Sequence, residues 1–492
     1  MTELAATDTA RRARRACRAR RTGCTLTAVG SALALAGCMS FIPAYERPAA
    51  PVAAVYAAEL MPSAAAAADG VATADLEWQR FFADARLRRL IEIALVNNRD
   101  LRVAVLNIEQ ARAAYQIRRA DELPTLGAGV NAQRQPGANG ALVSSVAVGL
   151  QVTGYELDFF GRVRSLSQAA QAQYLATDAA RQTVQIALIA ALATTHISLL
   201  ADDELLRVTR ETLKSREDSW RLMKLKFDNG AASALDFAQA EQLLEGARAT
   251  LAQQQRQRLL DTNALELLTG QAVPSDISSG GSNALPDALP LAAQQGVRDL
   301  PAGLPSELLT RRPDVRAAEQ LLLAANANIG AARAAFFPRI ALTANAGSAS
   351  TALSGLFKSG SFALTGSANL LLPIFDAGRN RANLEVAKVN KEIAIAQYEK
   401  AIQSAFRDVA DALAGRATLG EQLRAQTAQT NAAQRTFALA DLRYRNGASS
   451  YLEVLDAQRT LFAAQQATIQ VQALQVQNQI SLYKALGGGW KD

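Results

Sequence analysis

Few residues in this chain of 492 residues can carry out acid–base, nucleophilic or metal chemistry. It has one histidine, His196, and three cysteines, none of which follows Cys38. A histidine-based catalytic triad or a metal centre with several nitrogen and sulfur ligands therefore lacks the residues to build it. The glycine-rich phosphate loop G-x-x-x-x-G-K is also absent from the sequence. We conclude that the sequence argues against an enzyme, and we expect His196 to be a packed or hydrogen-bonded core residue.

One pair of acidic residues has the spacing of neighbours on one face of a helix. Glu453 and Asp456 are three positions apart in "YRNGASSYLEVLDAQRTL" (444–461), which places both on one face of a helix. An earlier stretch, "FDNGAASALDFAQAEQLL" (227–244), is similar to it, and seven of the eighteen aligned positions are identical. The first copy carries Asp236 and then Gln239 at the equivalent positions. Only the second copy has paired acids, and spacing alone indicates a solvated helix face for them.

This repeated stretch belongs to a duplication of the whole chain. Arg102 matches Arg316, and Gly161-Arg162 matches Gly378-Arg379, and the matched residues are separated by nearly the same number of positions as the two similar stretches are. Each half reads as a helix, a hairpin of two strands, a long helix, an Asn-Gly turn and a last helix. We therefore predict an α+β fold with these segments: a leader (1–37), an extended tether (38–75), a first repeat (76–270), a linker (271–303), a second repeat (304–486) and a tail (487–492).

The predicted helices of the two repeats correspond. They cover 76–122, about 164–227 and a stretch ending at 267–270 in the first repeat, and 307 onwards, 375–447 and a stretch ending at Gly487 in the second. The most apolar piece, "QTVQIALIAALATTHISLLA" (182–201), has seven polar side chains among its twenty. Polar residues make insertion into a bilayer unfavourable, so we interpret it as a buried part of a long soluble helix.

The strand segments have the length of strands that cross a membrane. Segments 125–134 and 142–157 form the first predicted hairpin, and 336–347 and 360–373 form the second. Strands of about ten residues can span a bilayer when they are tilted. Four strands cannot close a barrel, and an open sheet edge is not viable in lipid. We expect other copies to close the sheet, and three chains would supply twelve strands.

The positive charge is concentrated at the N-terminus. The chain has a net charge of +7, and residues 1–37 hold seven arginines against Glu3 and Asp8, which leaves the remainder at +2. A nearly neutral body lacks the basic surface of a nucleic-acid binder, so we exclude that class. The arginines are followed by the apolar run "CTLTAVGSALALAGC" (24–38), in the order of a secretory signal.

The end of that run resembles a bacterial lipoprotein signal. Leu35-Ala36-Gly37-Cys38 is similar to a lipobox, in which the cysteine is acylated and becomes the new N-terminus. Met39 after the cysteine favours sorting to the outer membrane. The alternative is an ordinary signal peptide with a chance cysteine. We expect a lipid on Cys38 and no other cofactor.

Three stretches carry a resemblance to a known family. These are "GYELDFFGRVR", "GLPSELLTRRPDVRAAEQLLLAANANIGAARAAFFPRIALTANAG" and "YLEVLDAQRTL…LYKALGGGW". They closely resemble the outer-membrane efflux proteins of the TolC/OprM type, in particular the NodT-like lipoprotein branch. The resemblance implies a homotrimer with a twelve-strand β-barrel in the outer membrane and a long α-helical barrel in the periplasm. It also implies two partners, a periplasmic adaptor (membrane fusion protein) and an inner-membrane RND-type pump.

The resemblance assigns roles to residues at the two Asn-Gly turns. Leu452, Glu453 and Asp456 match positions that line the periplasmic gate, where threefold symmetry would gather six carboxylates and allow block by cations. Tyr444, Arg459 and Asp236 match positions that link neighbouring helices in the closed state. Ser449 departs from relatives that carry an arginine there, so the closing links here can differ.

The function implied is a passive duct that exports drugs and other toxic small molecules. Export of metal ions or type I protein secretion through the same kind of duct is the alternative. A periplasmic adaptor, which is a coiled-coil connector, would need a single helical hairpin beside a compact β domain. Two hairpin repeats and four membrane-length strands argue against that class.

Overall fold

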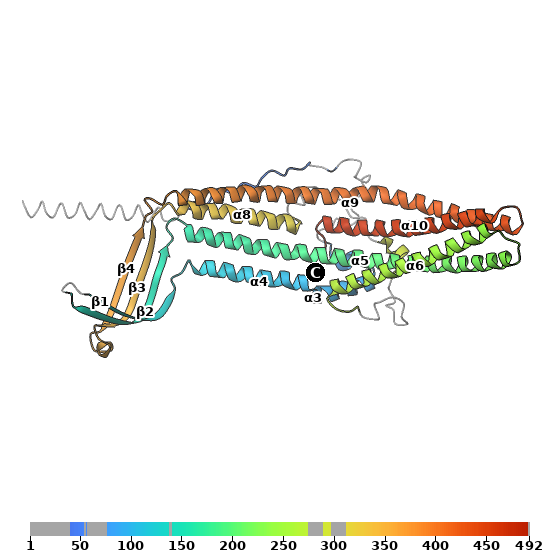
Figure 1. Ribbon diagram of the computed structural model, residues 1–492. Coiled ribbons are helices and arrows are strands. Elements are labelled where there is room, and N and C mark those ends of the chain that lie inside the picture. The colour runs from blue at the N-terminus through green and yellow to red at the C-terminus, as the bar shows by residue number, and fades with distance from the viewer. Residues whose placement is uncertain are drawn as a thin grey trace, which may run out of the picture. The chain divides into compact units, whose positions relative to one another are not determined.

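The computed structural model describes residues 40–53, 56, 76–136, 140–273, 289–296 and 311–490. Contacts divide the chain into two units, which we describe separately. The first draws its described residues from 1–48, 109–175 and 319–396, and the second from 49–108, 176–318 and 397–492. The chain crosses the division within four helices (Figure 1).

The first unit contains a four-stranded antiparallel sheet in the order β1-β2-β3-β4 (Figure 1). The strands are β1 (Leu126–Pro136), β2 (Leu142–Leu157), β3 (Arg339–Ser350) and β4 (Phe362–Leu371). All four predicted strands are therefore confirmed, with small differences at their ends. The order leaves β1 and β4 as the two edges, each with one row of unpaired backbone groups in the described chain.

The register of the sheet separates an apolar face from a polar one. Leu150, Ala346 and Leu364 lie opposite one another in one row. The next row holds Gln151, Asn345 and Thr365. Because successive residues of a strand point to opposite faces, apolar and polar rows face opposite sides of the sheet. This is the alternation of a strand with lipid on one side and water on the other.

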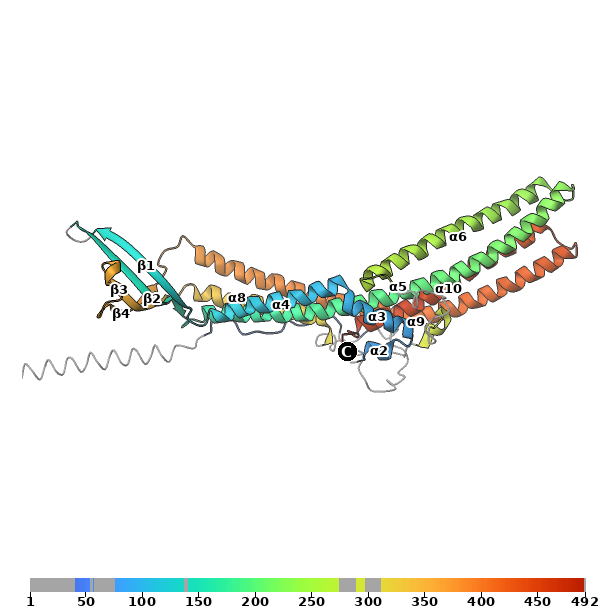
Figure 2. The same cartoon turned by 90° about the horizontal axis from the view of Figure 1, so that it is seen from below.

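Two helical hairpins of similar size make up much of the second unit, and the first helix of each begins in the first unit. They are formed by α5 (Arg162–Asp228) with α6 (Ala234–Thr269), and by α9 (Arg379–Arg445) with α10 (Tyr451–Ala485), as both views show (Figure 2). The two longer helices have 67 residues each, about 100 Å of helix at 1.5 Å per residue. The predicted duplication is confirmed at the level of the elements. Small buried residues such as Ala193 and Ala405 let these helices pack closely.

The predicted single helix over 76–122 is wrong. The structure has three helices there, α2 (Trp78–Phe81), α3 (Ala85–Asn97) and α4 (Arg99–Ala120). Asp84 is extended and its carboxylate accepts hydrogen bonds from the backbone of Arg86 and Leu87, which starts α3. Asn98 is also extended and accepts from the backbone N–H of Leu101 at 2.9 Å. Short polar side chains that cap a new helix compete with continuation of the old one.

Two short helices were not predicted from the sequence. The linker contains a short 3₁₀ helix, η3 (Leu291–Gly296). A second one, η4 (Leu353–Gly355), lies between β3 and β4. The predicted start of a helix at 307 lies outside the described residues, and Pro313 is in the first turn of α8 (Pro313–Ala334), as expected.

His196 is a buried, hydrogen-bonded residue, as expected. Its Nε2 lies 3.2 Å from Oδ2 of Asp84, which also accepts from Gln294 at 2.5 Å. Burial acts to raise the pKa of Asp84, but the hydrogen bonds and charge of its neighbours, His196 first, hold it below 3.8. This network joins α5 and η3 to the residue that starts α3.

Among the described helices, α5 is the one with an 18-residue stretch apolar enough to cross a membrane by composition. Half of that stretch is buried within the chain.

Candidate functional site

The two Asn-Gly turns fold in the same way. Gly230 and Gly447 follow α5 and α9 with φ values of 71° and 70°, in the left-handed region that favours glycine. The backbone N–H of Ala231 donates to Lys226 at 2.7 Å, and that of Ala448 donates to Arg443 at 2.9 Å. Both ends are Schellman motifs, with an αL glycine and a six-to-one hydrogen bond.

The asparagines before these glycines are also equivalent. The side-chain amide of Asn229 donates to the carbonyl of Leu225 at 2.7 Å, and that of Asn446 donates to Leu442 at 2.8 Å. Each carbonyl also accepts from the backbone N–H of the same asparagine, at 3.3 and 3.2 Å, so the amide adds a second hydrogen bond to the last turn of its helix. Identical residues in the two copies therefore build identical hairpin tips.

The helices that leave the two tips begin differently. At the first tip, Ser233 and Asp236 form a capping box: the backbone N–H of Asp236 donates to the Ser233 hydroxyl at 3.1 Å, and that of Ser233 donates to the Asp236 carboxylate at 3.4 Å. At the second tip, Ser450 makes no side-chain cap. Glu453, which is equivalent to Asp236, has no hydrogen bond or ion pair with the described residues. The carboxylate at this position is used as a cap in the first repeat and is free in the second.

The three predicted gate residues point away from the core of the second tip. Leu452 is 54% exposed, and the Asp456 side chain is 60% exposed. Their neighbours Val454, Leu455 and Ala457 are buried in a cluster that also includes Tyr451, Met223, Ala240 and Ala440. The helix therefore fixes its apolar face against the chain and presents Leu452, Glu453 and Asp456 to solvent.

Of the three predicted linking residues, Tyr444 bridges two helices within the chain. The ammonium of Lys226 on α5 donates to the Tyr444 hydroxyl at 2.7 Å, and it lies 4.8 Å from the Tyr444 ring centroid. Arg459 pairs with Asp456 on its own helix. Asp236 bonds to Ser233 in its own capping box. That Arg459 and Asp236 link the helices of neighbouring copies stays a prediction.

Sequence reasoning missed Lys226 and Tyr451. The Tyr451 ring lies 5.1 Å from that of Tyr444, and burial raises the pKa of its hydroxyl. Lys226 is equivalent to Arg443 in the second repeat, so the duplication did mark a positive charge at this position. The contact with Tyr444 joins one repeat to the other, which spacing along the chain cannot reveal.

Comparison with known proteins gives one consistent result. The model of the family "outer membrane efflux protein" matches residues 90–271 and 304–488. The chain is similar to the antibiotic efflux pump outer membrane protein ArpC of Pseudomonas putida, with 47% identity over 468 residues that cover 94% of each chain. It is equally similar to the solvent efflux pump outer membrane protein SrpC of Pseudomonas putida, with 47% identity over 465 residues covering 93% of this chain and 97% of that protein.

A solved structure agrees with these relatives. The open state of the MtrE outer membrane channel of Neisseria gonorrhoeae has a TM-score of 0.82 and 42% identity, covering 92% of this chain and 99% of that one. The family model spans both repeats, with the strands and both hairpin tips. The predicted α+β fold is confirmed, and so is the conclusion that the protein is a channel rather than an enzyme. The chain belongs to the outer membrane efflux protein family and is the outer-membrane channel of an efflux system.

Proposed function

We propose that three copies of this chain form a passive duct that carries small toxic molecules across the outer membrane. The observation that carries the proposal is the four-stranded sheet with two open edges and one apolar face. β1 and β4 run in opposite directions, so β1 of one copy can pair with β4 of the next in the antiparallel sense. Joined in this way, three copies make about twelve strands, within the range of outer-membrane barrels.

The relatives support the kind of cargo and the partners. ArpC is named for antibiotics and SrpC for solvents, and both are named as outer membrane proteins of efflux pumps. We propose that this chain likewise receives apolar drugs and solvents from an inner-membrane RND-type pump through a periplasmic adaptor. A duct of this kind needs no cofactor, because the pump supplies the energy.

We propose that Leu452, Glu453 and Asp456 form the periplasmic gate. Glu453 makes no cap and Asp456 is exposed, so both carboxylates face outward from α10. Threefold symmetry would bring six carboxylates around one axis, which attracts multivalent cations. Tyr444, Arg459 and Asp236 would hold the tips of neighbouring hairpins together in the closed state.

We also propose that Cys38 carries a lipid. Cys38 lies outside the described residues, but the chain that follows it is well anchored within the first unit. The Phe41 ring stacks on Phe337, which precedes β3, with centroids 4.7 Å apart. Arg47 donates two hydrogen bonds to Glu319 on α8, at 2.7 and 2.8 Å.

The position of Phe41 supports a lipid on Cys38, because Phe41 lies at the junction between the helices and the strands of the first unit. Phe41 also stacks with Phe160, which follows β2. The two residues between Cys38 and Phe41 allow the cysteine to reach about 10 Å from this junction. An acyl chain on Cys38 would therefore start at the membrane surface beside the sheet.

The test is functional replacement with a count of copies. The gene is expressed in a strain that lacks its own outer-membrane efflux channels but keeps a cognate adaptor and pump. We expect restored tolerance to toluene and to an antibiotic, and mass photometry of the detergent-extracted protein should show three copies. A stable monomer, or tolerance no better than the empty vector, would reject the proposal.

A further inference from the structure

Away from the ends that join the helices, the two strand hairpins carry two charged side chains, and both are cations. Arg134 is the only charged residue between 126 and 155, and Lys358 is the only one between 340 and 371. Figure 1 shows the turns of both hairpins at the end of the sheet away from α8. Within the described residues, neither cationic side chain has an ion pair or a hydrogen bond. This outward end of the sheet therefore carries positive charge that no described acidic side chain neutralises.

The register of the sheet places Arg134 on the apolar face. Arg134 lies opposite Ser144 on β2. Ser144 and Leu150 are six residues apart on that strand without an irregularity between them, so both side chains point to the same side. Leu150 belongs to the apolar row described above. Arg134 therefore projects from the face that we assign to lipid and not from the polar face of the lumen.

The position of Arg134 along its strand places it near the outer edge of the membrane. Arg134 is eight residues beyond Leu126, where β1 begins. Eight residues extend about 27 Å along a strand, or about 20 Å in height at a tilt of about 40°. The apolar band of an outer-membrane barrel is about 25 Å tall. An arginine at this height can keep its stem on the apolar surface and extend its guanidinium to the lipid headgroups.

Lys358 lies in the loop 351–361, which joins β3 to β4 at the same end of the sheet. Ser350, the last residue of β3, lies on the apolar face one row before Arg134. The loop therefore begins close to the level of Arg134. Hydrogen bonds within the loop hold Lys358 in place, because its backbone carbonyl accepts from the N–H of Ser361 at 3.1 Å.

Large apolar side chains surround this lysine in the sequence and are exposed. Leu353 is 74% exposed, Phe357 82% and Phe362 73%. Phe362 is two residues before Leu364 on β4, so it lies on the apolar face and continues it outward. Barrels in outer membranes have aromatic residues at this level, where acyl chains meet headgroups. A free anion would leave these side chains in water, and an uncharged apolar molecule would leave the cations unpaired.

We propose that Arg134 and Lys358 bind the phosphate-bearing headgroup of lipid in the outer leaflet, while Leu353, Phe357 and Phe362 contact its acyl chains. A guanidinium and an ammonium are the side-chain groups that bind phosphate oxygens most strongly. Clusters of such cations beside apolar surface are typical of sites for anionic lipids. The site rests on the proposed barrel and identifies the class of lipid that surrounds its outward end.

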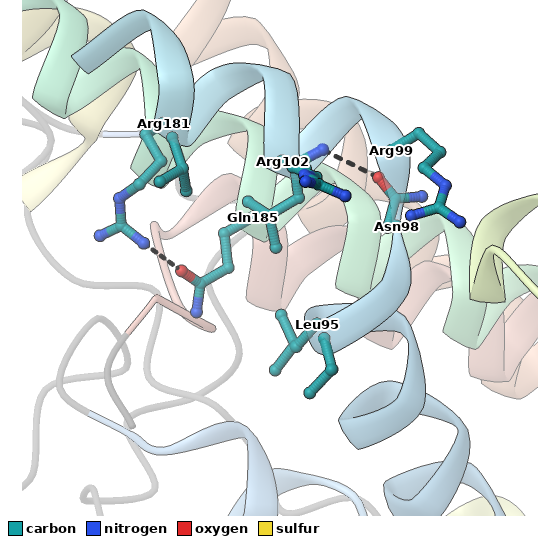
Figure 3. Close-up of a pocket in the computed structure, with 9 residues that line it drawn as sticks. Leu95, Asn98, Arg99, Arg102, Arg181 and Gln185 are labelled. Atoms are coloured by element: carbon teal, nitrogen blue, oxygen red, sulfur yellow. Dashed lines mark hydrogen bonds between the residues drawn. The ribbon is translucent and has the colours of Figure 1, made fainter. Parts of the chain in front are cut away.

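A second arginine-rich region provides a control for the attraction of anions in general. A cavity of about 490 Å³ lies where α3 gives way to α4, beside α5 (Figure 3). Arg99, Arg102 and Arg181 line it, and none of its lining residues is acidic. These residues belong to the second unit and not to the sheet. Arg102→Gln therefore removes an exposed arginine without touching the proposed lipid site.

Titration of the detergent-purified full chain with lipid A, followed by native mass spectrometry, tests the charged part of the site. In Arg134→Gln with Lys358→Gln, the lipid A concentration for half-occupancy should rise about tenfold or more, because both cations are lost. Arg102→Gln should bind like the parent protein. Lipid A stripped of its phosphates should bind the parent and the double variant equally. No difference between parent and double variant, or the same loss in Arg102→Gln, would reject the site.

A second arm tests the apolar part and separates a lipid from a free anion. Phe357→Ser should weaken lipid A binding several-fold, since it removes an acyl contact and leaves both cations in place. Inorganic phosphate at millimolar concentration should not displace lipid A. Displacement by phosphate, or unchanged binding in Phe357→Ser, would overturn the lipid assignment. Any of these failures in a protein that mass photometry shows as three copies leaves the proposed duct intact, whereas a monomeric parent protein would reject the proposed function itself.

Discussion

Glu453 and Asp236 occupy equivalent positions in the two repeats, and the fold uses their carboxylates differently. Asp236 is held in the capping box with Ser233, whereas Glu453 has no such bond. A capped carboxylate is oriented toward its own backbone and is less available to ions. The gate proposal therefore depends on two differences between the tips, the uncapped Glu453 and the acid Asp456 where the first repeat has Gln239.

Removing the charges of the second tip should remove block by multivalent cations. In Glu453→Gln with Asp456→Asn, the concentration of hexamminecobalt that halves single-channel conductance should rise about tenfold or more, because the ring of carboxylates is lost. Glu241→Gln is the control, since it neutralises an exposed acid on α6 that has no part in the proposed gate. Equal loss of block in both variants would place the cation site elsewhere.

Among the secondary-structure elements, the sheet allows a paired test of which face meets lipid. Leu364 and Thr365 are neighbours on β4 and lie in the apolar and polar rows respectively. An arginine on the lipid side costs about 2–4 kcal/mol near the middle of the bilayer, and one in the lumen costs little. Leu364→Arg should reduce the amount of folded protein in the outer membrane, whereas Thr365→Arg should insert normally. Heat-modifiability on gels measures both, and equal insertion would contradict the assignment of faces.

The pairing of α5 with α6 contains a titrating group. Burial and the hydrogen bond with Asp261 on α6 raise the pKa of Asp202 to about 7, the charges of Asp261 and Asp203 add to this, and Arg258 opposes it. Between pH 3.8 and about 7, the native state binds more protons at Asp202 than the unfolded chain does. The free energy of unfolding therefore falls as pH rises through this window.

The melting temperature followed by circular dichroism should then be lower near pH 8 than near pH 5. Asp202→Asn should reduce this difference, because an amide stays neutral at both values. Asp178→Asn makes the same change on α5 outside the acidic cluster and serves as the control. A pH difference that persists in Asp202→Asn, or disappears equally in Asp178→Asn, would assign the effect to another group.

For the molecule as a whole, the anchored N-terminal segment predicts a double attachment to the membrane. Cys38→Ala should abolish incorporation of labelled palmitate while the sheet still inserts, because strand pairing and the Phe41 stack with Phe337 do not involve the cysteine. We expect the variant to stay in the outer-membrane fraction and to keep three copies. Palmitate labelling of the variant equal to that of the parent protein would end the lipid assignment.

Local sequence patterns were sufficient to predict the duplicated plan and most element boundaries. The glycines at 230 and 447, the alternation in the strands and the long proline-free helices depend on residues close together in the chain. Local rules of this kind act before any tertiary contact forms, so they can be read in order along the sequence. The membrane-length strands and the place of the two tips follow from them.

Contacts between distant residues set the features that the sequence did not predict. The helix over 76–122 breaks at Asp84 and Asn98, whose side chains also contact His196 and the backbone of Leu268. Lys226 meets Tyr444 although the two are far apart in sequence. A polar side chain can hydrogen-bond within its own helix or to a residue remote in sequence. The second bond forms only when the fold brings that residue within hydrogen-bond distance. For that reason the capped acid and the bridging lysine were visible only in the folded chain.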